Sequence, residues 1–345
     1  MERGSRTADY DFELPSAQIA QTPLEQRASS RLLIVDRQSG RITHGAFTDL
    51  IGLAAPGDAL VLNTTKVIRA RLLGKRSSGA AAEILLLRAL GNDRFEAMVS
   101  PGGKLLPGRV IHVAPGFDVD ILETTERRTR IVQVRCSIPV QEAISRYGHV
   151  PLPPYIWRRD DDADAERYQT VYAREEGSVA APTAGLHFTD EVLESIESRG
   201  VRRVDVVLHV GAGTFKPVET ADPADHHMHE EWYSVGEEAA CALNETRSRG
   251  AHVWAVGTTS VRTLESAASA DGSFAATEGD TRLFIRPGYR FRAVDKLVTN
   301  FHLPRSTLIM LVAAFAGYDL TTRAYREAIH AGYRFYSYGD AMAVV

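Results

Sequence analysis

The sequence has few cysteines and no apolar run of membrane-spanning length. Cys136 and Cys241 lie far apart in the chain, so neither a disulfide framework nor a CxxC zinc pattern is present. The longest charge-free apolar stretch, 306–318, is shorter than the roughly 20 residues of a membrane helix and predicts a buried helix. Residues 1–15 lack the apolar segment of a signal peptide. We therefore expect a cytoplasmic protein that does not enter a membrane.

The sequence also lacks an excess of charge of one sign. Its 345 residues include 40 Lys and Arg against 44 Asp and Glu, a formal net charge of −4. With 44% hydrophobic and 24% charged residues, the composition is that of a globular protein and excludes a disordered chain. The balance also excludes a protein that coats nucleic acid through bulk positive charge, although it leaves a local basic face possible. The length suggests about two domains.

One part of the chain has a purely β texture. Several strand-length runs between residues 66 and 147 are separated by glycine-rich and polar turn signals, a spacing typical of sandwiches and barrels. The expected strands are 68–74, 81–90, 94–99, 109–113, 117–123 and 130–136. We therefore predict an inserted, barrel-like all-β domain at 66–147.

The flanking segments, 1–65 and 148–345, alternate strands with helices. Strands are expected at 31–35, 41–44, 59–62, 204–210 and 252–256 and near residues 283 and 296. Helices are expected after Thr189 and Glu237 and near Ser260, Ser306 and Thr322. This alternation predicts an α/β main domain whose largely parallel or mixed sheet is flanked by helices. The charged stretch 157–167 is expected to be a mobile, solvated loop.

Four polar segments of the main domain are candidates for a site, because ligands of open α/β sheets bind beyond the carboxyl ends of strands. They are 181–189, 209–215, 257–262 and 299–307. The second lacks the third glycine of a dinucleotide fingerprint and also fits a tight turn, while Thr258 and Thr259 also fit a plain helix cap. His187 precedes a helix start, where the dipole favours a neutral imidazole that can act as a base or donor. A capping or core histidine is the alternative.

The histidine-rich segment 226–231 raises the question of a metal. Imidazoles and a carboxylate suit zinc, but the spacing is not that of HExxH and no cysteine is nearby. A polar-ligand site or a histidine-rich surface loop fits better, and we predict no metal site. No Walker loop or nucleophile elbow is present. The residues alone therefore predict a two-domain α/β enzyme with a histidine-rich polar cleft.

Long motifs in the same order as those of a known family cover nearly the whole chain. They lie at 10–11, 19–25, 30–32, 148–156, 168–172, 180–188, 208–215, 226–231, 257–265, 299–308 and 333–342. In these motifs the sequence resembles the S-adenosylmethionine:tRNA ribosyltransferase-isomerase family of queuosine biosynthesis.

The resemblance implies transfer and isomerisation of the ribosyl group of S-adenosylmethionine. The acceptor is 7-aminomethyl-7-deazaguanine at the wobble position of a tRNA anticodon loop, the product is epoxyqueuosine, and adenine and methionine leave. Such a reaction needs a base beside the sulfonium, a donor for the departing adenine and a neutral amine nucleophile. It needs no metal or redox cofactor, since S-adenosylmethionine is a substrate. We expect the enzyme to act as a monomer.

The resemblance also implies roles for particular residues. His187 or His209 fits the base, and His302 or Arg262 fits assistance to the leaving group. Substrate binding is expected from Asn63, Thr65, His149, Thr183, Gly185, Gly211, Gly213, Thr214, His226, His229, Glu231, Thr258, Thr259, Asn300, Arg305, Ser306, Thr307, Tyr338 and Asp340. Binding of tRNA is expected from Arg69, Arg71, Lys75, Arg76 and Lys104, for each of which a solvent-facing surface cation is the alternative.

The chain departs from the family pattern near the insertion. Where the family commonly has Asn-Asp-Thr-Arg-Val-Ile-Pro-Ala-Arg, this chain has Thr64, Lys66 and Arg69 at the acidic, arginine and proline positions of 63–71. Lysine keeps the charge of arginine but loses its planar fork. The segment 100–105 lacks two cations of the family's basic stretch. These changes leave open a paralogue that uses a non-tRNA acceptor, or a catalytically silent tRNA- or nucleotide-binding protein; a metallohydrolase is a more distant reading.

Overall fold

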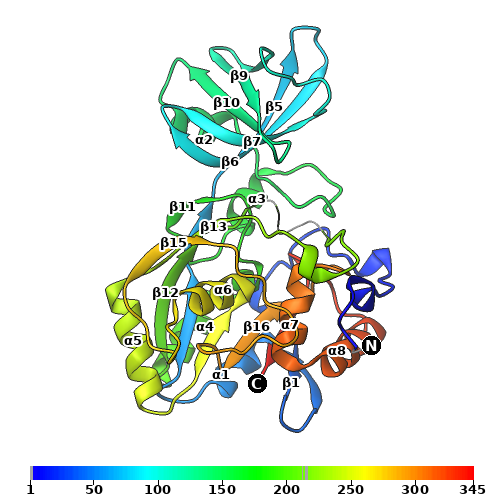
Figure 1. Cartoon of the computed structure of the whole chain (residues 1–345). Coiled ribbons are helices and arrows are strands. Elements are labelled where there is room, and N and C mark those ends of the chain that lie inside the picture. The colour runs from blue at the N-terminus through cyan, green and yellow to red at the C-terminus, as the bar shows by residue number, and fades with distance from the viewer. Residues whose placement is uncertain (1–2, 212, 214–216) are drawn as a thin grey trace.

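The computed structural model describes residues 3–211, 213 and 217–345 (Figure 1). Thr214, one of the predicted substrate-binding residues, lies outside these residues. Nothing in the described part of the chain forms a helix both long enough and apolar enough to cross a bilayer.

A mixed sheet forms the centre of the main domain. Within the described residues its order is β15-β13-β12-β3-β14-β16-β17-β1-β2. Strands β12, β3, β14 and β16 are parallel, so their carboxyl ends meet at one edge, whereas β17 is antiparallel to β16. The bounds are β1 (Arg31–Val35), β2 (Ile42–Ala46), β3 (Ala59–Asn63), β12 (Arg202–Leu208), β13 (Glu231–Val235), β14 (Val253–Val256), β15 (Thr277–Thr281), β16 (Lys296–Asn300) and β17 (Ala341–Val344). The predicted α/β fold with a mixed sheet is confirmed.

Helices cover both faces of this sheet because its buried side chains alternate between them. Val61 and Ala255 pack with α5 (Glu237–Ser248), α6 (Gly257–Ala267), α7 (Thr307–Ala316) and α8 (Tyr318–His330). Leu62 and Trp254 pack on the other side with α1 (Leu50–Leu53) and α4 (Asp190–Ser198). The helices therefore cover both faces of the central strands, and the carboxyl edge is left to carry polar residues.

The helix starts follow from local chemistry. The hydroxyl oxygens of Thr189 and Ser306 accept the N–H groups of Val192 and Ile309, each at 3.3 Å, and so begin α4 and α7. Helix α6 begins at Gly257, three residues before the expected start near Ser260. Gly257 has a φ of +87°, which lets β14 pass into α6 without a loop.

The insertion is a closed antiparallel barrel of order β10-β7-β6-β5-β8-β9. Its strands are β5 (Arg71–Arg76), β6 (Ala81–Gly91), β7 (Arg94–Ser100), β8 (Val110–Ala114), β9 (Phe117–Thr124) and β10 (Arg130–Cys136), so all six expected strands are present. Helix α2 (Val140–Tyr147), which we had not predicted, packs Ala143 and Ile144 into the barrel core. The domain boundaries at residues 66 and 147 remain a prediction.

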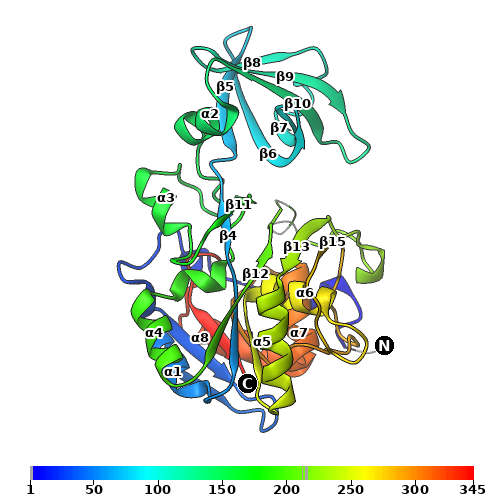
Figure 2. The same cartoon turned by 90° about the vertical axis from the view of Figure 1, so that its left-hand side faces the viewer.

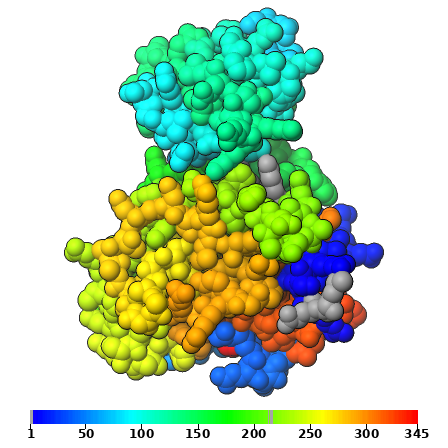
Figure 3. Space-filling view, in the orientation of Figure 1, coloured from blue at the N-terminus to red at the C-terminus, as the bar shows by residue number. Residues whose placement is uncertain are grey.

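The chain enters and leaves the barrel at adjacent places. On the way in, β4 (Thr65–Val67) pairs with β11 (Glu175–Ser178) and continues into β5 (Figure 2). On the way out, the N–H of His149 donates to the carbonyl oxygen of Arg71 at 2.8 Å. The barrel stands beyond the carboxyl edge of the sheet, and a waist separates it from the main domain (Figure 3).

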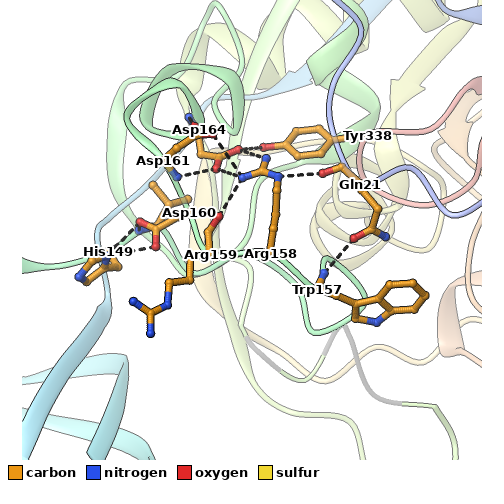
Figure 4. A network of polar contacts seen from close by, with 10 residues as sticks. Gln21, His149, Trp157, Arg158, Arg159, Asp160, Asp161, Asp164 and Tyr338 are labelled. Carbon is orange, nitrogen blue, oxygen red and sulfur yellow. Dashed lines mark hydrogen bonds and ion pairs between the residues drawn. The ribbon is translucent and has the colours of Figure 1, made fainter. Parts of the chain in front are cut away.

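The segment 157–167 differs from the loop that we expected. Its second half is α3 (Asp162–Arg167), capped by Asp161, whose carboxylate accepts the N–H of Asp164 at 3.1 Å. The Asp164 carboxylate lies 2.6 and 2.7 Å from the two terminal guanidinium nitrogens of Arg158 and also accepts the Tyr338 hydroxyl at 2.8 Å (Figure 4). A run of charge suggested solvation, whereas Asp164 is buried between the nearby Arg158 and Tyr338, which is remote in sequence.

Candidate active site

A pocket lies where β14 and β16 end, and we call it the strand-end pocket. Its polar lining comes from the first turn of α6, the end of β16 and the turn η5 (Thr183–His187). The parallel pairing of Val256 with Val298 brings the first two of these together. Its lining residues are Tyr155, Ala181, Pro182, Thr183, Ala184, Val210, Gly257, Thr258, Thr259, Thr299, Asn300, Phe301, His302, Leu303, Leu308, Tyr336 and Ser337. Five predicted site residues (Thr183, Thr258, Thr259, Asn300 and His302) thus share one pocket.

A second pocket, the histidine pocket, shares the lining residue Leu308 with the first. Its lining comes from the histidine-rich segment, α6 and the start of α7: Gly213, His226, Met228, His229, Glu231, Arg262, Thr307 and Leu308. Burial, together with the nearby His229 and His227, lowers the pKa of His226. His226 is therefore neutral near pH 7 and able to accept a proton.

The charged centre of the histidine pocket is a buried ion pair. Arg262 donates through Nη1 to Oε2 of Glu231, and both residues are more than nine-tenths buried. The other carboxylate oxygen accepts the N–H of Gly211 at 2.9 Å, and Arg262 Nε donates to the carbonyl of Leu283 at 3.0 Å. Arg262 Nη2 is buried and has no hydrogen-bond partner among the described residues. A fixed donor of this kind suits a ligand oxygen or ring nitrogen.

His302 is the predicted catalytic histidine that lines the strand-end pocket. Its Nε2 lies 2.8 Å from the hydroxyl of Thr299, and its backbone N–H donates to the Tyr325 hydroxyl at 3.0 Å. Burial lowers the pKa of His302 to about 3, so the ring is neutral at physiological pH. A neutral imidazole fixed at one nitrogen can exchange a hydrogen bond with a leaving group through the other.

His187 lies behind the strand-end pocket and does not line it. Its Nδ1 is 2.8 Å from the Ser30 hydroxyl, and its Nε2 is 3.2 Å from Nδ2 of Asn300. Burial lowers the pKa of His187 to about 3, and the charges of Arg334 and Arg27 act in the same direction. With both ring nitrogens occupied, His187 is not placed to remove a proton from a substrate in this pocket.

His209 follows β12 and lines neither pocket. Its Nδ1 is 2.8 Å from the Thr65 hydroxyl, and its ring stacks on Trp232 with centroids 5.2 Å apart. The Thr65 hydroxyl also bonds Ser178, whose oxygen accepts the N–H of Val210 at 2.7 Å. Burial lowers the pKa of His209 against an opposing effect of Glu175. This cluster ties β4, β11 and β12 together at the base of the barrel connection.

Several other predicted binding residues use their polar atoms within the fold. The Asn63 amide bridges to the backbone of Leu208 at 3.0 Å in both directions, which joins β3 to β12. Ser306 caps α7, and Asp340 accepts the N–H groups of Arg31 and Arg334 at 3.0 and 2.8 Å. Tyr338 donates to Asp164. Gly185 lies against Tyr172 and Thr170, which leave no room for a side chain.

The remaining predicted binding residues lie outside the strand-end pocket. Arg305 sits 3.6 Å from the Asp11 carboxylate, in the left-handed region at φ +54°. His149 Nδ1 lies 3.0 Å from Asp160 at the barrel connection. Gly213 lies against His229, and Thr307 begins α7 beside the histidine pocket.

The predicted tRNA-binding cations lie on the barrel side. Arg71 pairs with Glu83 at 3.1 Å and donates to the Leu152 carbonyl. Lys75 and Lys104 are exposed, while Arg69 and Arg76 are partly exposed. Arg130, another arginine of the barrel, is buried and donates to backbone carbonyls of Leu105 and Gly102.

The family model described as "Queuosine biosynthesis protein" matches residues 7–344. The chain belongs to this family. It is 52% identical to the S-adenosylmethionine:tRNA ribosyltransferase-isomerase of Symbiobacterium thermophilum over 99% of this chain and all of that protein, and 50% identical to that of Heliobacterium modesticaldum over 97% and 98%. The crystal structure of an S-adenosylmethionine tRNA ribosyltransferase from Thermotoga maritima, 40% identical, covers 97% of this chain and 99% of its own with a TM-score of 0.57.

Within this family fold, sequence reasoning missed residues that shape the site. Tyr155 and Tyr336 line the strand-end pocket, with ring centroids 4.7 Å apart, and Ser30 holds His187. All three lie inside or beside motifs already noted, but a motif does not say which side chain faces the pocket. For the metal question, the described residues contain no group of three or more His, Cys, Asp or Glu arranged to hold an ion.

Proposed function

We propose that this protein transfers and isomerises the ribosyl group of S-adenosylmethionine onto 7-aminomethyl-7-deazaguanine at the wobble position of a tRNA anticodon loop. The product is epoxyqueuosine in tRNA, and adenine and methionine are released. The observation that carries the proposal is the strand-end pocket, with neutral polar groups and aromatic walls, which shares the lining residue Leu308 with the histidine pocket. Relatives about half identical over their full lengths have names that specify this donor and this class of acceptor.

The chemistry divides between the two pockets. A proton must be removed beside the sulfonium, and the neutral His226 and the neighbouring His229 of the histidine pocket supply imidazoles for this step. The departing adenine needs a hydrogen-bond partner, and we assign this role to His302, which lines the strand-end pocket. The amine nitrogen then bonds to the ribosyl group and loses a proton, and an oxygen of the ribosyl group closes the epoxide as the carbon–sulfur bond breaks and methionine leaves. These steps are proton transfers and substitutions, so we propose that no metal or redox cofactor takes part.

The position of the barrel, and not the net charge of the chain, supports tRNA as the acceptor. The barrel stands over the carboxyl edge and carries Lys75 and Lys104 exposed. Lys66, at the family's arginine position, pairs with Glu176 at 3.0 Å. We propose that the anticodon loop enters between the barrel and the main domain, and that one chain suffices for the reaction.

The deciding experiment supplies S-adenosylmethionine and an anticodon stem-loop that carries the aminomethyl-deazaguanine. Liquid chromatography with mass detection then follows adenine, methionine and the modified nucleoside. Equimolar formation of all three is expected, and a stem-loop with unmodified guanine serves as the control. Adenine formed only with a free deazapurine would favour the paralogue, and stem-loop binding without any adenine would favour a silent binder.

A further inference from the structure

Two buried polar atoms of the strand-end pocket have no hydrogen-bond partner among the described residues. They are Oδ1 of Asn300 and Oγ1 of Thr259. Asn300 is only 1% exposed, and both side chains line the pocket. A buried polar atom without a partner costs free energy, so such atoms call for an explanation by a ligand.

The orientation of the Asn300 amide is determined by its neighbours. Its Nδ2 lies 3.1 Å from the carbonyl oxygen of Tyr336, which can only accept, and 3.2 Å from Nε2 of His187. An amide nitrogen can only donate, so His187 Nε2 accepts. Both hydrogens of the amide are then used. The oxygen that remains is an acceptor with a fixed position.

A second layer holds this arrangement in place. Because His187 Nε2 accepts, its Nδ1 carries the proton and donates to the Ser30 hydroxyl at 2.8 Å. The Ser30 hydroxyl in turn donates to the carbonyl of Arg27 at 3.4 Å. In each hydrogen bond that leads from Asn300 through His187 and Ser30 to the Arg27 carbonyl, the donor and the acceptor are therefore determined. His187 and Ser30 thus act on the ligand through Asn300 and are positioning residues.

The other atom offers the opposite polarity. The hydroxyl of Thr259 can donate, and it stands in the first turn of α6, next to the strand that ends at Asn300. One acceptor beside one donor matches the edge of a 6-aminopurine, where an exocyclic amino group adjoins a ring nitrogen. The pocket walls include Tyr155, Phe301 and Tyr336, which suit a flat aromatic ring.

The absence of negative charge from the pocket lining favours a neutral amino group over an ammonium group as the donor to Asn300. No Asp or Glu is among the described residues that line it, and His302 is neutral. A substrate ammonium would enter without a counter-charge, which is costly in a buried site. A neutral nucleobase amino group carries no such cost.

We infer that the strand-end pocket is the adenine subsite, in which Asn300 Oδ1 accepts from the 6-amino group, Thr259 donates to a ring nitrogen, and His187 and Ser30 hold the Asn300 amide in this orientation. The inference rests on the proposed function only in taking an adenine nucleoside as the ligand.

Calorimetric binding of nucleosides to the full chain tests the inference without turnover. Wild-type protein should bind adenosine at least about tenfold more tightly than purine riboside, which lacks the 6-amino group. Asn300→Ala should bring this ratio to within about twofold. His187→Leu should also reduce the ratio, while purine riboside binding is retained. A general loss of structure would instead weaken both nucleosides equally.

Thr259→Val tests the second contact. It should equalise binding of adenosine with either 1-deazaadenosine or 7-deazaadenosine, whichever lacks the contacted nitrogen, and should leave the adenosine to purine riboside ratio intact. Thr263→Val is the matched control, because it makes the same change on the same helix at a residue whose hydroxyl donates to the Thr259 carbonyl at 3.0 Å. It should leave both ratios unchanged.

Equal binding of adenosine and purine riboside by the wild type would overturn the inference, whether or not any variant folds. A failure of the proposed function is separable from this result. Discrimination among nucleosides without any transfer would remove the proposed function and leave the subsite. Transfer from a 6-deamino analogue of S-adenosylmethionine at the same rate as from S-adenosylmethionine would leave the proposed function and remove the subsite.

Discussion

Glu231 of β13 and Arg262 of α6 form an ion pair, and both residues are more than nine-tenths buried. Removing one partner leaves the other charge without compensation, so Arg262→Ala or Glu231→Ala should lower the free energy of unfolding by about 3–5 kcal/mol. The double variant Glu231→Gln with Arg262→Met should recover much of that stability without recovering adenine release. Urea unfolding and an adenine assay measure the two quantities. A double variant no more stable than either single variant would contradict a coupled pair.

The two buried histidines predict a loss of stability in mild acid. The pKa of His187 and of His302 is about 3 in the folded protein, because burial disfavours the charged ring, against an ordinary value near 6.5. The unfolded chain therefore binds more protons between these values, and stability is complete above pH 6.5 and falls as the pH drops toward 3. Each histidine should cost about 2 kcal/mol between pH 6.5 and pH 5.

Urea unfolding at pH 7.5 and pH 5 measures this slope. His302→Asn or His187→Gln should flatten it, since the titrating ring is gone. His330→Asn, an exposed histidine in the last turn of α8, is the control and should leave the slope unchanged. An unaltered slope in both buried variants would show that other groups govern the acid sensitivity.

The Arg158–Asp164 pair predicts the stability of the segment around α3. Burial raises the pKa of the Asp164 carboxyl, but the hydrogen bonds from Arg158, Asp161 and Tyr338 outweigh it and the net pKa is lowered. Asp164→Asn should destabilise the protein by about 3 kcal/mol, because Arg158 loses its partner. Tyr338→Phe should cost about 1 kcal/mol. Asp162→Asn, on the exposed side of the same helix, should change stability by less than about 0.5 kcal/mol.

Thermal unfolding and limited proteolysis at 157–167 report on this prediction. Faster cleavage is expected in Asp164→Asn and not in Asp162→Asn. If both variants resist cleavage as the wild type does, the ion pair does not hold the segment.

The cations of the barrel predict the salt dependence of tRNA binding. Lys75→Ala and Lys104→Ala should each weaken binding of an anticodon stem-loop at low salt and reduce the slope of log K against log salt by about 0.7–0.9, one released counterion per lost contact. Arg249→Ala is the control, because Arg249 follows α5 at the amino edge of the sheet, away from the barrel. Fluorescence anisotropy across a salt series measures the slopes. Equal slopes for all three variants and the wild type would move the docking face elsewhere.

Local patterns predicted much of the fold for physical reasons. The six barrel strands alternate apolar and polar residues between turn signals, and Thr189 and Ser306 cap their helices through bonds to residues three positions on. Strand β17, with the sequence AMAV, has no alternation because both its faces are buried, and it was missed. Helix α3 was missed because the run of charge favoured a solvated loop, although Asp161 and Asp164 form a capping box at its start. The bond of Asp164 to Tyr338, remote in sequence, is the part that no local pattern reveals.

The candidate site was also predicted only in part from local patterns. Strand-end polarity led to Thr258, Asn300 and His302, which do meet in one pocket. It did not separate side chains that face a ligand from those that face back into the fold. His187 and Asn300 lie in equally polar motifs, yet Asn300 lines the pocket, whereas His187 lies behind it and bonds the Asn300 amide. That distinction depends on which way each ring or amide is turned, and this is a property of packing.

The barrel interrupts the main domain without spreading it, because the segments that lead in and out lie side by side at Arg71 and His149. Removing the barrel would leave two chain ends already next to each other. Substitutions within the insertion, or exchange of the whole insertion, can therefore accumulate without moving any strand that carries the strand-end pocket. In evolutionary terms, the part that faces the donor and the part that faces the acceptor can be inherited separately.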